Sequence, residues 1–581
     1  MGVPFNFPDA PTVGQIFGSY KWDGEKWVGI SGGVPDAPFD GTQYGRQQVS
    51  GSMAWTAVTS GNFTSDLPTT PAVRSSLNKM RDYVDIRDWN GIDLTGANGC
   101  ADIVQDAITK TAAAGNVLHI PAGTIAIEKA LWWPGASHIE GMGQAGREGL
   151  TANGKFSYFY FTHDKIGIQS TSETISDGGG STNRSIRKMN FKRNQPAPRV
   201  GWEPGGFDFD VDVCGTYDAA IEDCMFLNPT RMIRIRGNAD LKFGAGRVTL
   251  RNIKGQPIYY GIEIDNSYDG SFWDAIHLWP FWSFDDAHDS SVMKWSYANG
   301  EAFRIARADN VDMGRLFCFC YQLGMNLIQN PSNDSAYPGG AGTRNGCELL
   351  YSDGCATGIL AQTNGGHMMI NRFVQAGRYS GASAPPIAGV RVYGNDNQLT
   401  IQRSSVYRST VGAYEIAGSN NLITIGEHDG FDLGGIEFNN NGAGNKLRLL
   451  TSPLTAAPTV YGGNAVIESP DWRASSSAVS QDAGSISAGC TIRFRRQGRS
   501  TAVQMRITVN SSTGGAFIEV QVPFPAGTTG SVMFGIKDSH GIPVTAQILG
   551  GSTRMIIKKI DNTYPGGGAC SFLISGEYES P

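Results

Sequence analysis

Acidic and aromatic residues are crowded into one stretch of the chain, residues 263–312. The stretch holds ten carboxylates and four of the chain's 12 tryptophans. Sugar rings present apolar C–H faces that pack on aromatic rings, and their hydroxyl groups donate hydrogen bonds to carboxylates. The pattern therefore indicates a carbohydrate-contacting surface. Its acidic residues are Glu263, Asp265, Asp269, Asp274, Asp285, Asp286, Asp289, Glu301, Asp309 and Asp312.

Hydrolysis of a glycosidic bond needs two carboxyl groups, one protonated and one ionised. A separation of about 5–5.5 Å gives retention of configuration, whereas about 6.5–9.5 Å leaves room for a water and gives inversion. Asp309 and Asp312, with Asp274 across from them, are our first choice, and Glu301 is the reserve acid. Crowded like charges raise the pKa of one member, which divides the two roles. The competing interpretation is that these residues only form turns.

Six side chains in the same stretch are candidates for substrate binding. Aromatic rings would pack on sugars, and arginines would bind acidic sugars. The run Leu278–Phe284 has a second interpretation, because its two Trp and two Phe could instead plug the interior or a subunit interface. The six candidates are Tyr268, Trp279, Trp282, Trp295, Arg304 and Arg307.

Polysaccharide lysis is the second chemical alternative. A lyase needs a base and a cation that neutralises the uronate carboxylate. Tyr259, Tyr260 or His277 could be the base, Arg304 or Arg307 the cation, and a lyase would call for Ca²⁺ among the Asp residues. No other cofactor and no metal centre is expected, because the nine cysteines form no Cys-x-x-Cys pair and are expected to be buried thiols. Neither a Gly-x-Ser-x-Gly elbow nor a phosphate-binding glycine loop is present.

Composition excludes several classes of protein. Of 581 residues, 76 are glycine and only 17% are charged, which is typical of many short strands joined by tight turns. The net charge of −6 argues against nucleic-acid binding, which needs a field of lysine and arginine. The sequence contains no apolar run of about 18 residues, which is the length that would predict membrane insertion. The first residues show no secretory signal, so synthesis in a cytoplasm is expected.

Four segments follow from the pattern along the chain. Residues 1–30 contain Tyr and Trp around Asp23-Gly24 and predict a hairpin module. Residues 31–84 predict a linker ending in a short helix over 71–84. Residues 85–455 predict the main body, with an amphipathic helix over 101–116 and a strand–turn–strand over 117–127. Residues 456–581 predict a C-terminal β-sandwich.

The sequence pattern of the main body predicts a parallel β-helix. Its short β-like runs are separated by Asn, Gly, Asp and Ser at irregular spacing, and no helix alternates with them. We see no fixed blade repeat that would indicate a propeller. Coils would stack about 4.8 Å apart, and positions i and i+2 of one strand would lie about 6.6 Å apart. The fold class is therefore all-β, a right-handed parallel β-helix with two accessory modules.

Two N-terminal motifs carry a family resemblance. The segment from Asp85 through the helix to Ile120-Pro-Ala-Gly-Thr124 resembles the opening of pectate-lyase-like β-helices in bacteriophage tailspikes and tail fibres. The family's Asp-rich DFGAxGDG-type loop is matched only approximately by Asp85–Gly99. The segment 7–28 resembles a module that begins many phage tail proteins. The resemblance implies a homotrimer in the virion tail, attached to a baseplate or tail protein through residues 1–30.

The same resemblance implies binding, and usually cleavage, of a bacterial surface polysaccharide. Asp429-Gly-Phe-Asp432 also resembles the stretch that carries paired catalytic aspartates in some O-antigen-cleaving tailspikes. Its flanks do not match, so Asp429 and Asp432 are second-choice catalysts. The expected function is endo-hydrolysis of a capsule or O-antigen. The alternatives are a lyase, a receptor fibre that binds glycan without cutting it, and a structural baseplate component.

Overall fold

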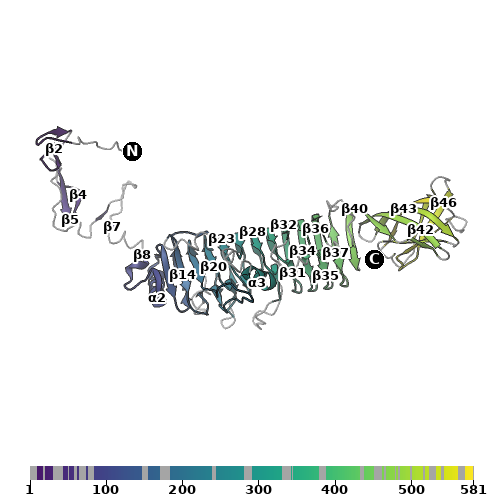
Figure 1. Ribbon diagram of the computed structural model, residues 1–581, viewed down its shortest axis with the longest axis horizontal. Coiled ribbons are helices and arrows are strands. Elements are labelled where there is room, and N and C mark those ends of the chain that lie inside the picture. Colours follow the sequence, from purple (N-terminus) through teal and green to yellow (C-terminus); the bar gives the residue numbers. More distant parts are fainter. Residues whose placement is uncertain are drawn as a thin grey trace. The chain divides into compact units, whose positions relative to one another are not determined.

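A computed structural model gives the architecture in two units, Met1–Val84 and Asp85–Pro581. We describe each unit by itself (Figure 1). The structure describes residues 10–17, 20–29, 44–49, 52–57, 62–63, 74–75, 84–146, 155–170, 183–238, 244–280, 291–329, 342, 344–377, 388–431, 433, 438–450, 461–463, 466–477, 479–481, 485–497, 500–513, 517–522, 526, 531–537, 542–559 and 570–579.

The body of the second unit is a parallel β-helix, as the sequence predicted. The β-helix has three faces. In the described part of the chain, twelve parallel strands follow one another along one of them, which we call the third face. Each belongs to one coil, so the helix has twelve described coils (Figure 1). The strands are β12 (Leu131–Trp132), β15 (Ile168–Ser170), β18 (Phe209–Cys214), β21 (Arg231–Arg236), β24 (Tyr260–Asp265), β27 (Glu301–Ile305), β29 (Leu323–Leu327), β31 (Thr357–Ala361), β33 (Ala388–Val392), β35 (Gly412–Ile416), β37 (Phe438–Asn440) and β39 (Tyr461–Gly463).

Two further faces begin as separate short strands. The first face starts with β10 (Val117–His119), β13 (His138–Glu140), β16 (Arg184–Arg187) and β19 (Ala219–Glu222). The second face starts with β11 (Gly123–Ile127), β14 (Ser157–Phe161), β17 (Asn190–Arg193) and β20 (Met225–Leu227). The pairings within each face are parallel and in register from coil to coil.

From β23 onward one bent strand spans both faces. Its beginning pairs with β19 and its end with β20. The bend falls where Asp223, Asn252 and Ala275 adopt positive φ in successive coils. The outward side chains before and after the bend therefore face different directions. The long strands are β23 (Thr249–Gly255), β26 (Ser271–Leu278), β28 (Val311–Phe319), β30 (Asn345–Asp353), β32 (His367–Ala376), β34 (Gln398–Tyr407) and β36 (Leu422–Phe431), followed by β38 (Lys446–Leu449).

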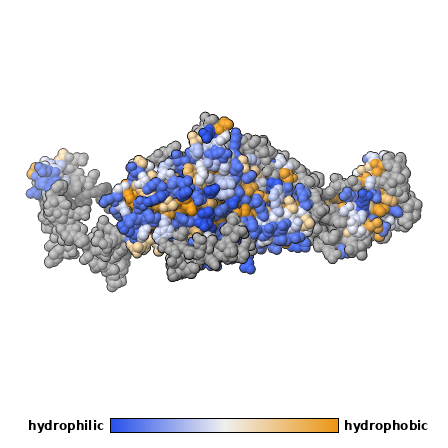
Figure 2. Space-filling view, turned by 90° about the horizontal axis from the view of Figure 1, so that it is seen from below, coloured by the Kyte–Doolittle hydropathy of each residue, from blue (hydrophilic) through white to orange (hydrophobic). Residues whose placement is uncertain are grey.

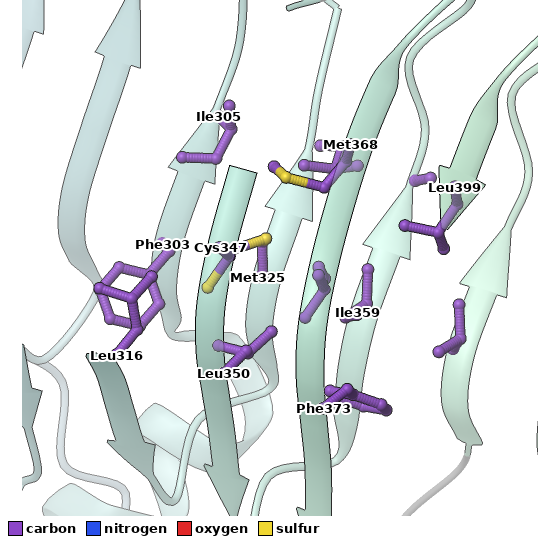
Figure 3. Packing of buried hydrophobic residues seen from close by; sticks show 14 of the residues in the cluster. Phe303, Ile305, Leu316, Met325, Cys347, Leu350, Ile359, Met368, Phe373 and Leu399 are labelled. Carbon is purple, nitrogen blue, oxygen red and sulfur yellow. The ribbon is translucent and has the colours of Figure 1, made fainter. Parts of the chain in front are cut away.

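Inward side chains form columns along the axis. Leu316, Leu350 and Phe373 are register partners in consecutive strands, and all three are buried (Figure 3). Phe303 and Met325 form a corresponding column on the third face. Successive residues of a strand point to opposite faces, so each inward apolar residue is followed by an outward one. This alternation brings the outward residues of adjacent coils side by side.

A helix closes the N-terminal end of the coils. The predicted amphipathic helix is present as α2 (Ala101–Ala114), and Gly115 ends it in the left-handed conformation with φ of 69°. Val104, Ala107 and Ile108 are buried, whereas the opposite side of α2 is exposed. The helix thus covers the open end of the apolar core. The preceding segment contains β8 (Val84–Asp85), the 3₁₀ turn η1 (Ile86–Asp88) and β9 (Thr95–Gly99).

An asparagine ladder supports the last coils. Asn397, Asn421 and Asn445 are buried at a spacing of 24 residues. The side-chain oxygen of each of the last two accepts a hydrogen bond from the backbone N–H of the ladder residue before it, at 2.9 and 2.8 Å. We did not recognise this repeat in the sequence, where the Gly-x-x-Asn spacing at 394, 418 and 442 would have revealed it.

One short helix interrupts the coils, although the sequence pattern indicated none. This helix, α3 (Ser291–Asn299), lies between β26 and β27. Met293 and Tyr297 pack with Cys320 and Ala356, while Val292 packs with Trp202. Neither α2 nor α3, the α-helices of the described ranges, could span a membrane. Two short strands, β22 (Ala245–Gly246) and β25 (Ser267–Tyr268), pair at the corner before the first face.

The C-terminal strands form an antiparallel β unit, as predicted. β40 continues from the last coil by pairing with β38 and then pairs with β42. From β42 onward, hydrogen-bonded neighbours follow in the order β42, β43, β48, β45, β46, β47, β44 and β41. The last of these strands, β41, directly follows β40 in the chain. The strands are β40 (Val466–Ser477), β41 (Val479–Gln481), β42 (Ser485–Gln497), β43 (Ser500–Thr513), β44 (Ile518–Gln521), β45 (Ser531–Lys537), β46 (Ile542–Ile548), β47 (Arg554–Lys559) and β48 (Cys570–Glu579).

The first unit contains the predicted hairpin. β1 (Ile16–Phe17), β2 (Tyr20–Trp22) and β3 (Trp27–Gly29) are antiparallel, and the rings of Trp22 and Trp27 lie 5.7 Å apart. Residues 31–84, predicted as linker and helix, differ from that expectation where they are described. β4 (Tyr44–Val49) pairs with β5 (Ser52–Ala57), and β6 (Asn62–Phe63) pairs with β7 (Arg74–Ser75).

The prediction of a helix over 71–84 is therefore wrong at Arg74–Ser75, which belong to β7. A short helix with one apolar stripe is marginal without partners to pack against, so local strand pairing can replace it. Residues 71–73 and 76–83 of the predicted helix lie outside the described residues.

Candidate functional site

Two of the predicted carboxylates lie on the first face around an exposed aromatic ring. Asp312 of β28 is the register partner of Phe272 of β26, and Asp274 follows Phe272 by two residues. Both carboxylates are on outward positions, and the Phe272 side chain is 58% exposed. One strand spacing combined with a two-residue offset places their Cα atoms about 8 Å apart. We call Phe272, Asp274 and Asp312 the first-face cluster.

Asp274 is held as an anion. Arg315 of β28 binds it through two guanidinium nitrogens, at 3.1 and 2.8 Å, and through its backbone N–H at 3.0 Å. These bonds lower the pKa of Asp274 to about 2. Gly314 makes the approach feasible, because a Cβ at position 314 would overlap the Asp274 carboxylate. Asp274 is therefore ionised at neutral pH.

Asp274 is also one member of a column of alternating charges. Glu140, Arg187, Glu222, Arg251 and Asp274 are successive register partners on the first face. Glu222 forms ion pairs with both neighbours, at 2.7 Å to Arg187 and 2.8 Å to Arg251. Alternation of charge in such a column stabilises stacking. A structural role for Asp274 thus accompanies any catalytic one.

Asp312 has a different environment. It is exposed, and in the described part of the chain no hydrogen bond or ion pair holds its carboxylate. Its neighbours across the coils are the exposed ring of Phe272 and Gly346, which leaves open space beside it. The Asp312 carboxylate is thus accessible from outside the coils.

Asp309 lies at the corner that leads into the first face. Its carboxylate forms a 3.0 Å ion pair with Arg307, whose guanidinium lies 5.4 Å from the centre of the Tyr268 ring. One coil earlier Arg247 repeats the arrangement, 4.7 Å from the Tyr217 ring and paired with Asp218 and Asp269. Tyr268, Arg307 and Asp309, each a separate candidate from the sequence, thus lie together at this corner. The Tyr217–Arg247 group was missed, although Asp218 and Tyr217 lie at an equivalent turn.

Glu301 and Arg304 lie on the third face instead. Arg304 binds Glu301 at 2.6 Å and Glu263 at 2.8 Å, and its guanidinium lies 4.0 Å from the Tyr260 ring centre. Asn326 donates a further hydrogen bond to Glu301 at 2.8 Å. Burial and the adjacent Tyr259 raise the pKa of Tyr260. This network does not adjoin the first-face cluster.

The predicted tryptophans are dispersed over the molecule. Trp279 follows β26 on the second face, where its ring lies 4.6 Å from that of His277. Trp295 is on α3, where it donates a hydrogen bond to Glu203 at 2.6 Å and lies 5.5 Å from Tyr259. Trp282 lies outside the described residues. The two described tryptophans, Trp279 and Trp295, therefore each contact other side chains of the chain.

The second-choice catalysts are late in the helix, as their numbers imply. Asp429 of β36 lies on the second face and accepts a 3.3 Å hydrogen bond from the Tyr407 hydroxyl. Asp432 lies outside the described residues. Asp429 is separated from the first-face cluster by several coils and by the bend between faces.

The side chains proposed as lyase bases are partly buried or stacked on other side chains. Burial, followed by the positive charge of Lys254, lowers the pKa of His277. Within the described ranges, no group of three or more His, Cys, Asp or Glu could hold a metal ion. Tyr259 and Tyr260 stack on each other with ring centres 3.9 Å apart.

The sequence did not indicate Phe272 of the first-face cluster, nor Arg315, which binds its Asp274. Phe272 and Arg315 are among the residues that define its geometry, and neither was among the candidates. The strict alternation around Trp273 could have marked Phe272 as outward. Arg315 could not be paired with Asp274 without the register between coils. The face of the helix seen in Figure 2 is mainly hydrophilic with separate hydrophobic patches, a mixture suited to sugars.

No protein-family model and no curated protein matches the chain. Similar solved structures include the Dettilon tailspike, with 10% identity, a TM-score of 0.39, and coverage of 87% of this chain and 96% of that one. The tailspike of E. coli bacteriophage HK620 in complex with a pentasaccharide has 10% identity, a TM-score of 0.43, and coverage of 89% and 97%. An alpha-1,3-glucanase from Streptomyces thermodiastaticus has 10% identity, a TM-score of 0.36, and coverage of 70% of each chain. With such low identities and scores, these likenesses assign no activity.

Proposed function

We propose that this chain is a tailspike-type β-helix that binds and hydrolyses a bacterial surface polysaccharide. The observation that carries the proposal is the first-face cluster, in which two carboxylates flank an exposed aromatic ring. Strand geometry places the two Cα atoms roughly 8 Å apart, so both carboxyl groups could reach one glycosidic bond, and we propose an inverting mechanism. Phe272 offers the apolar surface on which a sugar ring packs.

The two carboxylates would divide the work by their surroundings. Asp274, ionised by Arg315, would accept a proton from the attacking water. Asp312 would be the acid that protonates the leaving oxygen. Asp312, which no described side chain holds, would be able to turn towards that oxygen.

The adjoining corner would extend the binding surface. Tyr268 and Tyr217 each carry a stacked arginine, and each arginine is paired with an aspartate. Such groups offer both hydrogen-bond donors and acceptors to sugar hydroxyls. Asp309 would then bind substrate instead of performing the chemistry. Glu301, Arg304 and Trp295 would belong to a separate surface.

Assembly and attachment are further parts of the proposal. We propose a homotrimer in the virion tail that is joined to a tail or baseplate protein through residues 1–30. The small Trp-containing hairpin supports both parts of the proposal, because it is too small to bury a core by itself.

The deciding experiment is cleavage of a panel of purified bacterial capsules and O-antigens, followed by light scattering after size exclusion. A reduction in molecular mass is expected for one glycan. Asp312→Asn and Asp274→Asn should each lower its rate at least about 100-fold. Glu427→Gln is the matched control, because Glu427 pairs with Arg403 at 3.1 Å at a similar exposure several coils away, and the cleavage rate of this variant should not change.

Other outcomes identify the alternatives. Binding without a fall in mass for any glycan would indicate a receptor fibre. Cleavage accompanied by ultraviolet absorbance of an unsaturated uronate would indicate a lyase. Full activity of Asp312→Asn would overturn our choice of site while leaving cleavage itself established.

A further inference from the structure

Two buried cysteines lie against each other between neighbouring coils. Cys318 is on β28, and Cys355 lies at the corner between β30 and β31. Their sulfur atoms are 3.9 Å apart, and both side chains are fully buried. We propose that this pair is an oxidation site, at which an intrachain disulfide forms and joins the two coils. This inference is independent of the proposed glycan chemistry.

The surroundings single out Cys355 as the reactive sulfur. It accepts a hydrogen bond from the Tyr321 backbone N–H at 3.4 Å. Burial by itself would raise the pKa of the Cys355 thiol, but the adjacent Cys318 thiol and the Tyr321 N–H outweigh burial and lower that pKa. Burial and the partner sulfur raise the pKa of Cys318. The thiolate needed for disulfide exchange therefore develops at Cys355, with a thiol directly beside it.

Other cysteines of the region lack such a partner. The thiol of Cys320 donates to the carbonyl oxygen of Met293 on α3 at 3.5 Å. That of Cys347 donates to the carbonyl oxygen of Gly314 at 3.9 Å. The described residues contain no cluster of ligands able to hold a metal, which leaves oxidation as the chemistry open to the pair. The contrast with Cys347 also provides a control.

The step balances with a disulfide as oxidant. The Cys355 thiolate attacks one sulfur of oxidised glutathione, forms a mixed disulfide and releases one glutathione thiolate. The Cys318 thiol loses its proton and attacks the Cys355 sulfur, which releases the second glutathione. The two cysteine sulfurs are oxidised, the two glutathione sulfurs are reduced, and both thiol protons pass to glutathione. Because both cysteines are buried, each attack requires transient opening of the corner near Tyr321.

The bond would stabilise the coils next to α3. It would close a loop between residues 37 apart in sequence, which restricts the unfolded chain. A protein folded in a reducing cytoplasm would gain this link after release into an oxidising medium. The oxidised form is therefore expected to unfold at a higher temperature than the reduced form.

The test incubates the native chain with oxidised glutathione and follows intact mass after alkylation of the remaining thiols. We expect a loss of two mass units, two fewer alkylated cysteines and a peptide pair linking Cys318 to Cys355, all reversed by dithiothreitol. Cys318→Ser and Cys355→Ser should each abolish the link. Cys347→Ser, an equally interior thiol of neighbouring coils, should retain it.

Three results would overturn the proposal. One is a wild-type chain that stays fully reduced, and a second is a link from Cys355 to Cys320. The third is a lasting glutathione adduct on Cys355 that Cys318 does not displace. The wild-type measurement decides the matter even where a serine variant fails to fold.

Discussion

Asp274 and Asp312 show how identical side chains acquire different chemistry from their neighbours. Asp274 is fixed by Arg315 at 2.8 Å, whereas Asp312 has no such partner among the residues that the structure describes. The two lie on adjacent coils, so a single sugar could contact both. This difference in their surroundings follows from one arginine. The arginine is therefore the residue to test.

We predict that Arg315→Gln raises the pKa of Asp274 from about 2 towards 3.8, because the hydrogen bonds that favour its anion are lost. If Asp274 acts as the base, the acidic limb of the cleavage profile moves to higher pH in parallel. The measurement is the rate of cleavage as a function of pH. Arg403→Gln is the control, since it breaks the comparable pair with Glu427. An acidic limb that stays in place would remove Asp274 from the mechanism.

The same pair has a limited effect on folding. A carboxyl whose pKa is lower in the folded chain contributes stability above its unfolded pKa, near 3.8, and loses it as the pH falls through about 2. Both side chains are well exposed, at 44% and 65%, so the contribution is below about 1 kcal/mol. Loss of activity in Arg315→Gln at neutral pH would therefore reflect chemistry instead of unfolding.

Among the elements, the corners between faces constrain the fold as much as the strands do. Each turn must return the chain to the same position one coil later, and buried backbone groups there need partners. Asn421 supplies hydrogen-bond partners to two of these buried backbone groups. Its side-chain oxygen accepts from the Asn397 N–H at 2.9 Å, and its amide donates to the Gly394 carbonyl at 3.0 Å.

We predict that Asn421→Ala lowers the free energy of unfolding by about 2 kcal/mol or more, because it leaves two buried backbone groups without partners. Chemical denaturation measures the change. Asn441→Ala is the matched control, because Asn441 is exposed in the next coil, and its substitution should have little effect. Equal stability of the two variants would show that the ladder does not support the coils.

At the scale of the molecule, the chain divides at residue 84. The residues from Asp85 onward form one unit, with α2 covering the first coil and β40 pairing with both the last coil and the C-terminal strands. The first-face cluster lies entirely within this unit.

We predict that a variant beginning at residue 85 folds and cleaves the same glycan at a rate within about twofold of the full chain. Thermal unfolding and the light-scattering assay provide the measurements. The full-length chain with Asp312→Asn serves as the inactive reference. A large fall in cleavage by the shortened, folded variant would indicate that residues 1–84 form part of the active assembly.

The sequence was sufficient for the parallel β-helix, the cap helix and the hairpin around Asp23-Gly24, because each depends on local periodicity or turn chemistry. It also indicated Tyr268, Arg307 and Asp309 as separate candidates, and the structure places these three at one corner. It failed at β4–β5, where neither strand shows a clear alternation of apolar and polar residues. It also missed α3, whose apolar residues are buried by contacts distant in sequence.

Local sequence determined by itself which side chains point inward and which outward, since that alternation is a property of every strand. Only the tertiary structure decided which outward residues meet. The number of residues in each coil varies with its loops, so the register between Asp274, Arg315 and Asp312 depends on how the whole stack closes. For the same reason Glu301, only eight residues from Asp309, lies on another face.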